Sequence, residues 1–151
     1  MFVLDQSIGA FVLVKTHIRI PSGHKVYSIN EAYVEDFPPE YREYLEFAHK
    51  NGYSSRYIGS MVADVHRTLL LGGVFLYPPT GSHAAGKLRL MYEANPMAMI
   101  VEEAGGKAMC APDARILEIR PEALHQRTPV ILGSSGEVDI VLKFLEGKTT
   151  P

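Results

Sequence analysis

The stretch Gly86-Lys87-Leu88-Arg89-Leu90-Met91-Tyr92-Glu93-Ala94-Asn95-Pro96 is the one around which the chain is organised. The alternation of side chains over residues 87–93 predicts a β-strand, with one face formed by Lys87, Arg89, Met91 and Glu93. The opposite face, formed by Leu88, Leu90 and Tyr92, is expected to be packed. Two cations and a carboxylate in a row suit a site that holds phosphate at one end and a metal ion at the other. A solvated edge strand explains the same pattern.

The residues that follow this strand predict a short helix. Asn95 is a typical N-cap and Pro96 a typical first helical residue, so we expect a helix over residues 96–104. Gly105 is expected to end it. If the strand is fully extended, roughly 20 Å separates the Cα atoms of Lys87 and Glu93, so the two side chains would address different ends of one long ligand.

Composition narrows the classes of protein that the chain fits. It has 151 residues, 46% hydrophobic, with a formal net charge of −2, which fits one domain and argues against a nucleic-acid partner. No apolar run reaches membrane-spanning length, so we expect no membrane association. The first residues lack the features of a signal peptide, and the single Cys110 excludes an internal disulfide. A cytoplasmic location is therefore expected.

Helical and strand patterns alternate along the rest of the chain. A hairpin is predicted within residues 1–14, with one strand over 1–4 and the other over 11–14. Further strands are predicted over 26–29, 74–77, 107–110, 115–119 and 129–133. Helices are predicted over 40–50, 61–71 and 137–145, the second of them buried because it is apolar nearly all round. This order predicts an α/β fold, a mixed sheet with helices on its faces, in a single domain over residues 1–151.

The segment from Arg56 to Met61 is a candidate anion-binding loop. Gly59 allows close approach of the backbone, and Ser60 and Met61 offer backbone N–H groups at the start of a helix. Arg56 and Tyr57 add a guanidinium and a hydroxyl. An ordinary capped helix with a surface arginine accounts for the same residues.

Polar residues that follow strands are further candidates. Asn30 and Tyr33 follow one predicted strand, and Tyr77 ends another. A turn asparagine and core-rim tyrosines are the alternative readings. The sequence shows no arrangement typical of a serine or cysteine nucleophile and no zinc spacing. Glu93 alone cannot hold magnesium, since such sites need several oxygen ligands.

Long motifs in a fixed order resemble the C-terminal half of class I fructose-1,6-bisphosphatase. They are Tyr27–Glu31, Arg56–Leu69, Gly73–Pro78, Gly86–Leu90, Tyr92–Ala98 and His125–Ser134. The resemblance covers nearly the whole chain and implies the fold of that family's substrate-binding domain.

The resemblance also implies roles for individual residues. It implies that the substrate's 6-phosphate is bound by Asn30, Tyr33, Tyr57 and Tyr77. It implies that Arg56 reaches the 6-phosphate of a neighbouring subunit, and that Lys87 binds beside the sugar ring and 6-phosphate. The backbone of Gly59, Ser60 and Met61 would line the sugar. Arg89 would lie near the 1-phosphate, and Glu93 would be a magnesium ligand.

Two departures from the family pattern qualify these expectations. Ala32 stands where the family has a glycine, and the family's N-terminal half, with the remaining acidic metal ligands, is expected to be absent. The first hypothesis is thus a domain of an Mg²⁺-dependent enzyme that converts fructose 1,6-bisphosphate to fructose 6-phosphate in gluconeogenesis, a homotetramer in the family. The alternatives are a non-catalytic phosphosugar-binding module and part of an enzyme that acts on the seven-carbon sedoheptulose bisphosphate.

Overall fold

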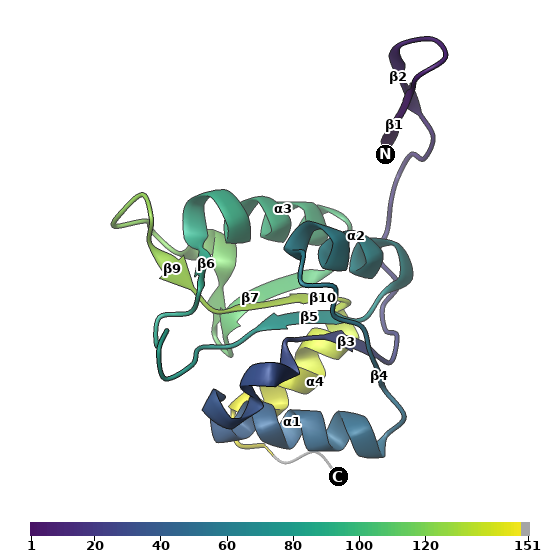
Figure 1. The fold of residues 1–151 in the computed structure, drawn as a ribbon. Helices are drawn as coiled ribbons and strands as arrows, with labels where there is room; N and C mark the ends of the chain where they lie inside the picture. Colours follow the sequence, from purple (N-terminus) through teal and green to yellow (C-terminus); the bar gives the residue numbers. More distant parts are fainter. Residues whose placement is uncertain (149–151) are drawn as a thin grey trace.

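A mixed six-stranded sheet forms the centre of the computed structural model, which describes residues 1–148 (Figure 1). Its strand order is β4-β3-β5-β10-β7-β8. The strands are β3 (Val26–Ser28), β4 (Ser54–Ser55), β5 (Val74–Tyr77), β7 (Lys107–Ala111), β8 (Ala114–Arg115) and β10 (Val130–Gly133). β3, β4 and β5 run parallel, and β10 pairs antiparallel with both β5 and β7. The predicted α/β class with a mixed sheet is confirmed.

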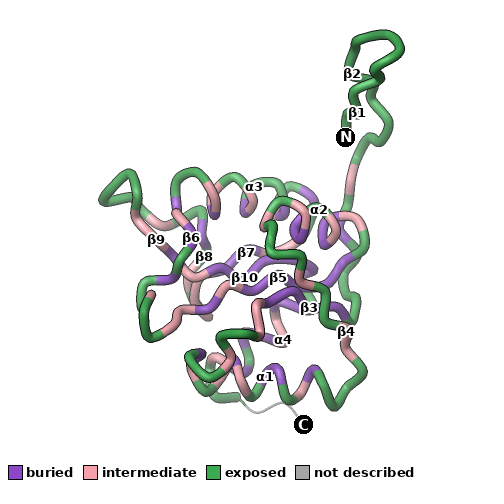
Figure 2. Tube along the Cα trace, viewed as in Figure 1, coloured by how far each residue is buried: buried purple, intermediate pink, exposed green. Residues whose placement is uncertain are grey.

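Helices cover both faces of this sheet. α2 (Met61–Leu71) and α3 (Asn95–Glu103) lie on one face, and α1 (Pro39–Lys50) and α4 (Ser135–Leu145) on the other (Figure 1). Neighbouring residues of β5 point to opposite faces, as a pleated strand requires: Leu76 packs in the core on the α1–α4 side and Phe75 in the core on the α2–α3 side. The buried residues therefore concentrate along the sheet, between two helical layers (Figure 2).

The stretch quoted first folds differently from its prediction. The strand over residues 87–93 is wrong beyond Arg89: β6 (Leu88–Arg89) is followed by a π-helical turn, η2 (Leu90–Ala94). The carboxylate of Glu93 accepts a hydrogen bond from the backbone N–H of Arg89 at 2.7 Å, which links the two ends of this turn. Tyr92 is 47% exposed instead of packed, because it lies on that turn.

The turn also changes how the next helix begins. Asn95 is not an N-cap, because its φ and ψ of −60° and −49° are already helical and η2 runs directly into α3. The expected end of the helix is confirmed, since Gly105 has φ +86° one residue after the C-cap Ala104.

Two further expectations are corrected. The predicted strand over 115–119 is limited to β8, because Ile116–Glu118 form a 3₁₀ turn, η3, that buries Ile116. Helix α2 is not buried all round, because Val62 and Leu71 are 61% and 57% exposed. Elements that were not predicted are η1 (Glu31–Asp36), β4, and β9 (Arg127–Thr128), which pairs with β6.

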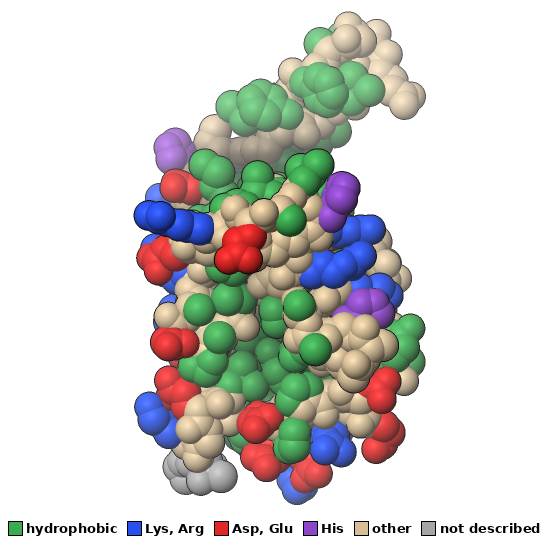
Figure 3. All heavy atoms as spheres, turned by 90° about the vertical axis from the view of Figure 1, so that its left-hand side faces the viewer, with side chains coloured by type: hydrophobic (Ala, Val, Ile, Leu, Met, Phe, Trp, Pro, Cys, Tyr) green, Lys and Arg blue, Asp and Glu red, His purple; other side chains and the backbone are tan. Residues whose placement is uncertain are grey.

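An arm of hydrophobic residues projects from this body. The predicted hairpin is confirmed as β1 (Phe2–Asp5) and β2 (Ala10–Leu13), joined in antiparallel register (Figure 1). All of its residues are exposed, with Phe2 at 64% and Phe11 at 71% (Figure 2). Figure 3 shows the arm extending beyond the body and carrying hydrophobic side chains. Within residues 1–148, no helix combines the length and the apolar character that crossing a membrane would require.

Candidate functional site

The candidate site lies at one edge of the sheet, where the three parallel strands end. Asn30 follows β3, Arg56 and Tyr57 follow β4, and Tyr77 ends β5. Because parallel strands share a direction, their carboxyl ends meet at the same edge, which is where α/β sheets bind ligands. The antiparallel β10 starts at this edge, so the β6–β9 ribbon just before it brings Lys87 and Arg89 to the same place.

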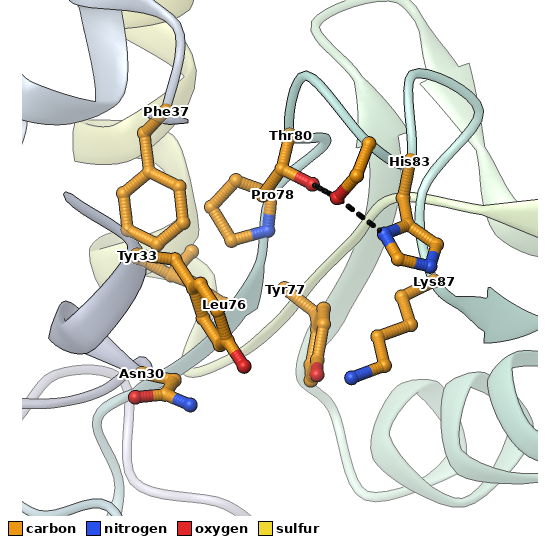
Figure 4. Close-up of a pocket in the computed structure, with 10 residues that line it drawn as sticks. Asn30, Tyr33, Phe37, Leu76, Tyr77, Pro78, Thr80, His83 and Lys87 are labelled. Carbon is orange, nitrogen blue, oxygen red and sulfur yellow. Dashed lines mark hydrogen bonds between the residues drawn. The ribbon is translucent and has the colours of Figure 1, made fainter. Parts of the chain in front are cut away.

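A cavity of about 150 Å³ opens beside the end of β5. Its wall contains Asn30, Tyr33, Phe37, Leu76, Tyr77, Pro78, Thr80, Ser82, His83 and Lys87. Figure 4 shows two parts of this wall. The rings of Phe37 and Pro78 form an apolar side, and the polar ends of Asn30, Tyr33, Tyr77 and Lys87 gather on the other side. An ammonium, two phenolic hydroxyls and an amide offer several hydrogen-bond donors to one anion.

A second cavity of about 330 Å³ adjoins the first and shares Tyr77, His83 and Lys87 with it. Its other lining residues are Tyr57, Gly59, Met61, Phe75, Leu88, Arg89, Glu93 and Arg127. Two adjoining cavities that share a lysine suit an extended ligand with more than one anionic group. The residues that line them come from four stretches of the chain, 30–37, 57–61, 75–93 and Arg127.

Tyr57 lines the second cavity. Burial raises the pKa of its hydroxyl, and the nearby Tyr77 and Asp64 raise it further. A raised pKa keeps the hydroxyl protonated, which is the form that donates to an oxyanion.

The loop after Tyr57 brings the backbone close to the same cavity. Gly59 adopts φ +83°, a conformation that other residues rarely adopt, and lines the cavity together with Met61. Ser60 is the N-cap of α2, although its side chain makes no capping bond, and it lines neither cavity.

Arg56 is the one predicted side chain that lies apart from both cavities. It lines a separate hollow of about 190 Å³ with Arg67 and Leu71, and its guanidinium donates to the carbonyl oxygen of Ser55 at 2.9 Å. The structure therefore does not bring Arg56 to the site of its own chain.

Arg89 and Glu93 form a pair on the wall of the second cavity. The Arg89 guanidinium Nη1 lies 3.3 Å from the Glu93 Oε1, and both side chains are partly exposed. The expected separation of roughly 20 Å between Lys87 and Glu93 assumed an extended chain and is wrong, because the chain turns after Arg89 and both residues line one cavity.

Among the lining residues that were not predicted from the sequence, two have nitrogen-containing side chains, His83 and Arg127. The His83 ring lies above the Lys87 side chain in Figure 4, and its Nδ1 is 2.9 Å from the hydroxyl of Ser82, which lies 3.3 Å from that of Thr80. Arg127 reaches the second cavity from β9 and donates to the carbonyl oxygen of Lys87. Neither residue stands in a local pattern that indicates a site: His83 lies in an irregular loop, and Arg127 is placed by the pairing of β9 with the distant β6.

A metal site is not complete within the described residues. Glu93 is the only acidic residue that lines either of the two cavities, and residues 1–148 contain no group of three His, Cys, Asp or Glu side chains that could hold a metal ion. One carboxylate, already bonded to Arg89, does not fit a magnesium site by itself.

Comparison with known proteins gives a consistent result for the fold and the sequence. Residues 20–146 match the family model described as fructose-1-6-bisphosphatase, C-terminal domain. The class 1 fructose-1,6-bisphosphatase of Synechococcus sp. (strain JA-3-3Ab) is 50% identical over 151 residues, covering 99% of this chain and 45% of that protein. The class 1 fructose-1,6-bisphosphatase of Cytophaga hutchinsonii is also 50% identical, covering 96% of this chain and 43% of that protein.

Solved structures agree. The holo form of Leishmania major fructose-1,6-bisphosphatase is 52% identical with a TM-score of 0.91, covering 95% of this chain and 46% of that one. The apo form of the same enzyme is 51% identical with a TM-score of 0.93, covering 96% of this chain and 47% of that one. The chain therefore belongs to the fructose-1,6-bisphosphatase family and matches its C-terminal domain. It spans slightly less than half the length of these relatives.

Proposed function

We propose that this chain binds the phosphorylated sugar of fructose 1,6-bisphosphate and of its product, fructose 6-phosphate. The observation that carries the proposal is the gathering of Asn30, Tyr33, Tyr77 and Lys87 on one side of the first cavity (Figure 4). In this proposal these groups, with Tyr57, hold the 6-phosphate. The sugar extends along Gly59 and Met61 into the second cavity, toward Arg89 and the 1-phosphate.

We further propose that the complete enzyme hydrolyses the 1-phosphate with Mg²⁺, as a cytoplasmic homotetramer that serves gluconeogenesis. The names of the relatives support the reaction, and Arg89 supplies a cation beside the proposed 1-phosphate position. Glu93 would be one oxygen ligand of the magnesium. Since the described residues supply no second carboxylate there, the remaining ligands have to come from elsewhere, and residues 1–148 by themselves bind without hydrolysing.

Calorimetric titration of the chain tests the binding. We expect fructose 6-phosphate to bind and fructose, which lacks the phosphate, not to bind. Lys87→Ala should weaken fructose 6-phosphate binding by about tenfold or more, the loss expected for one charge-assisted hydrogen bond. Lys143→Ala is the matched control, because Lys143 is exposed on α4 and lines neither cavity. Equal affinity in the Lys87 and Lys143 variants would contradict the proposal.

A phosphate-release assay tests whether the chain binds the substrate but needs the N-terminal portion for hydrolysis. The chain should release no phosphate from fructose 1,6-bisphosphate alone, and should do so when mixed with the N-terminal portion of a relative such as the Synechococcus enzyme. Magnesium-dependent turnover by the chain alone would overturn the proposed division. A preference for the seven-carbon bisphosphate over the six-carbon one would replace the proposed substrate.

A further inference from the structure

A buried carboxylate of α2 holds the loop that enters the second cavity. Asp64 is 0% exposed, and its two oxygens accept the backbone N–H of Ile58 at 3.1 and 3.2 Å. Its Oδ1 also accepts from the Arg67 Nη1 at 3.0 Å. A buried carboxylate with hydrogen bonds and a guanidinium partner is in a satisfied environment, so its geometry is well determined.

The guanidinium of Arg67 extends this arrangement to a second point on the loop. Its Nη2 donates to the carbonyl oxygen of Arg56 at 2.9 Å. The pair Asp64–Arg67 therefore grips the backbone at residue 56 and at residue 58, on either side of Tyr57. We use the term clamp for Asp64 and Arg67 together.

The clamp explains two features of the loop. Ser60 provides no side-chain cap for α2, and the bond to the loop comes instead from Asp64 within the first turn. With the backbone fixed on both sides, Tyr57 lines the second cavity while Arg56 lies in the separate hollow.

We infer that Asp64 and Arg67 are positioning residues for substrate binding, which fix the direction of Tyr57 and Arg56 without touching the substrate. The inference rests on the proposed function of the two cavities. Neither Asp64 nor Arg67 lines them, and their contacts run to the loop that carries Tyr57. An ion pair that only stabilised α2 would bond within the helix, but this one also holds two backbone groups of the loop before it, the N–H of Ile58 and the carbonyl of Arg56.

Arg67→Lys separates the two contacts. The planar guanidinium donates to Asp64 and Arg56 at once, and a lysine ammonium keeps the charge but not this fork. In the full chain we expect affinity for fructose 6-phosphate to fall by roughly tenfold, the loss of about one hydrogen bond. Exchange of the Ile58 amide hydrogen should become faster while the melting temperature changes little. Asp64→Asn, which keeps an oxygen for Ile58 and loses the ion pair, should act in the same direction.

A double-mutant cycle distinguishes positioning from general stabilisation. If the clamp acts through Tyr57, Arg67→Lys should cost little further affinity in a Tyr57→Phe background. Arg115→Lys is the matched control: Arg115 pairs with Glu102 and Glu118, each at 2.6 Å, and lines neither cavity, so affinity and Ile58 exchange should not change.

Two results would overturn the inference. One is additivity of Arg67→Lys with Tyr57→Phe, and the other is Ile58 exchange in Arg67→Lys that equals that of the unchanged chain. Failure of the unchanged chain to bind fructose 6-phosphate would instead overturn the proposed function. The Ile58 exchange measurement would then still decide whether the clamp holds the loop.

Discussion

Glu93 bonds two groups of Arg89, and these bonds determine which effects a substitution of Glu93 has. Its carboxylate accepts from the backbone N–H of Arg89 at 2.7 Å and from the Arg89 guanidinium at 3.3 Å. A glutamine at this position keeps an oxygen for the N–H and loses the negative charge. The turn should therefore survive Glu93→Gln while any role in holding a cation is lost.

We expect Glu93→Gln to leave the affinity of the chain for fructose 6-phosphate nearly unchanged. In the complemented enzyme it should lower magnesium-dependent phosphate release by about tenfold or more, because a charged metal ligand is removed. A magnesium titration of phosphate release checks this, with Glu103→Gln as the control, since Glu103 is exposed at the end of α3. An unchanged magnesium dependence would show that Glu93 does not bind the metal.

Buried tyrosines make stability depend on alkaline pH. Burial, and the hydrogen bond donated to Glu31, raise the pKa of Tyr27 to about 12. The pKa values of Tyr41 and Tyr44 are also raised, chiefly by burial. The folded chain thus keeps these protons where an unfolded tyrosine, with a pKa of about 10, loses them. The stability that this gives is complete below pH 10 and is lost as pH rises through about 12.

The expected result is a urea midpoint that falls steeply above about pH 10. Tyr27→Phe should reduce this dependence because one of the contributing hydroxyls is gone. Tyr92→Phe is the control, since Tyr92 is 47% exposed. Identical pH profiles for the two variants would argue against a contribution from Tyr27.

At the scale of elements, Gly86 sets how loop 78–86 returns to the sheet before Lys87. Its φ is +82°, and a Cβ there would lie 2.3 Å from the carbonyl carbon of Thr128. Gly52, after α1, has a similar φ of +74°, but a Cβ there would meet no atom within 4 Å. The two glycines thus separate backbone strain from steric overlap.

Gly86→Ala should lower the free energy of unfolding by about 3 kcal/mol or more, from left-handed strain plus overlap with fixed backbone. Gly52→Ala should cost only the strain, about 1 kcal/mol. Chemical denaturation of both variants measures the difference. Equal costs would mean that the β6–β9 ribbon moves aside freely.

The elements that could be predicted from sequence are those with a sustained pattern. Helices α1 and α4 and strands β5 and β10 carry clear apolar stripes or runs bounded by turn residues, and each was located within a few residues. The prediction of a strand over 87–93 fails despite the alternation, because the chain forms a helical turn after Arg89, in which the Glu93 carboxylate accepts from the Arg89 N–H. The alternation of side chains alone does not reveal that a local hydrogen bond favours a helical turn over a strand.

The candidate site shows the same division. The motifs indicate seven residues that lie around the two adjoining cavities, and their roles remain predictions. These residues are Asn30, Tyr33, Tyr57, Tyr77, Lys87, Arg89 and Glu93. The sequence patterns do not indicate His83 or Arg127: His83 lies in a loop turn that pairs with Thr80, and the place of Arg127 depends on the pairing of β9 with the distant β6.

At the scale of the whole molecule, the hydrophobic arm is attached to the body only through a short connection. The backbone hydrogen bonds of Val14 and Lys15 run to Met1, within the hairpin. The first bonds to the body are made by the Arg19 guanidinium to the carbonyl oxygen of Glu103 at 2.7 Å and by the N–H of Ile20 to that of Ala104 at 2.9 Å. Exposed apolar side chains on such an arm favour association with other surfaces.

Removal of residues 1–14 should leave the melting temperature nearly unchanged and reduce self-association of the chain. Sedimentation and thermal unfolding measure the two effects. Replacing Phe2 and Phe11 by serine in the full-length hairpin is the matched comparison, because it keeps the hairpin and removes its largest exposed side chains. A drop of several degrees on removal would show that the arm packs against the body in solution.

The place of β10 in the sheet also constrains the order of events during synthesis. β10 pairs with β5 and β7 on its two sides, yet it follows both in sequence. While a ribosome is still translating the codons before Val130, each of these strands has one open edge and both helical layers lack the strand between them. Such edges invite pairing with other nascent chains. The central sheet is therefore complete only after β10 has been synthesised, and until then the facing edges of β5 and β7 lack the strand that joins them.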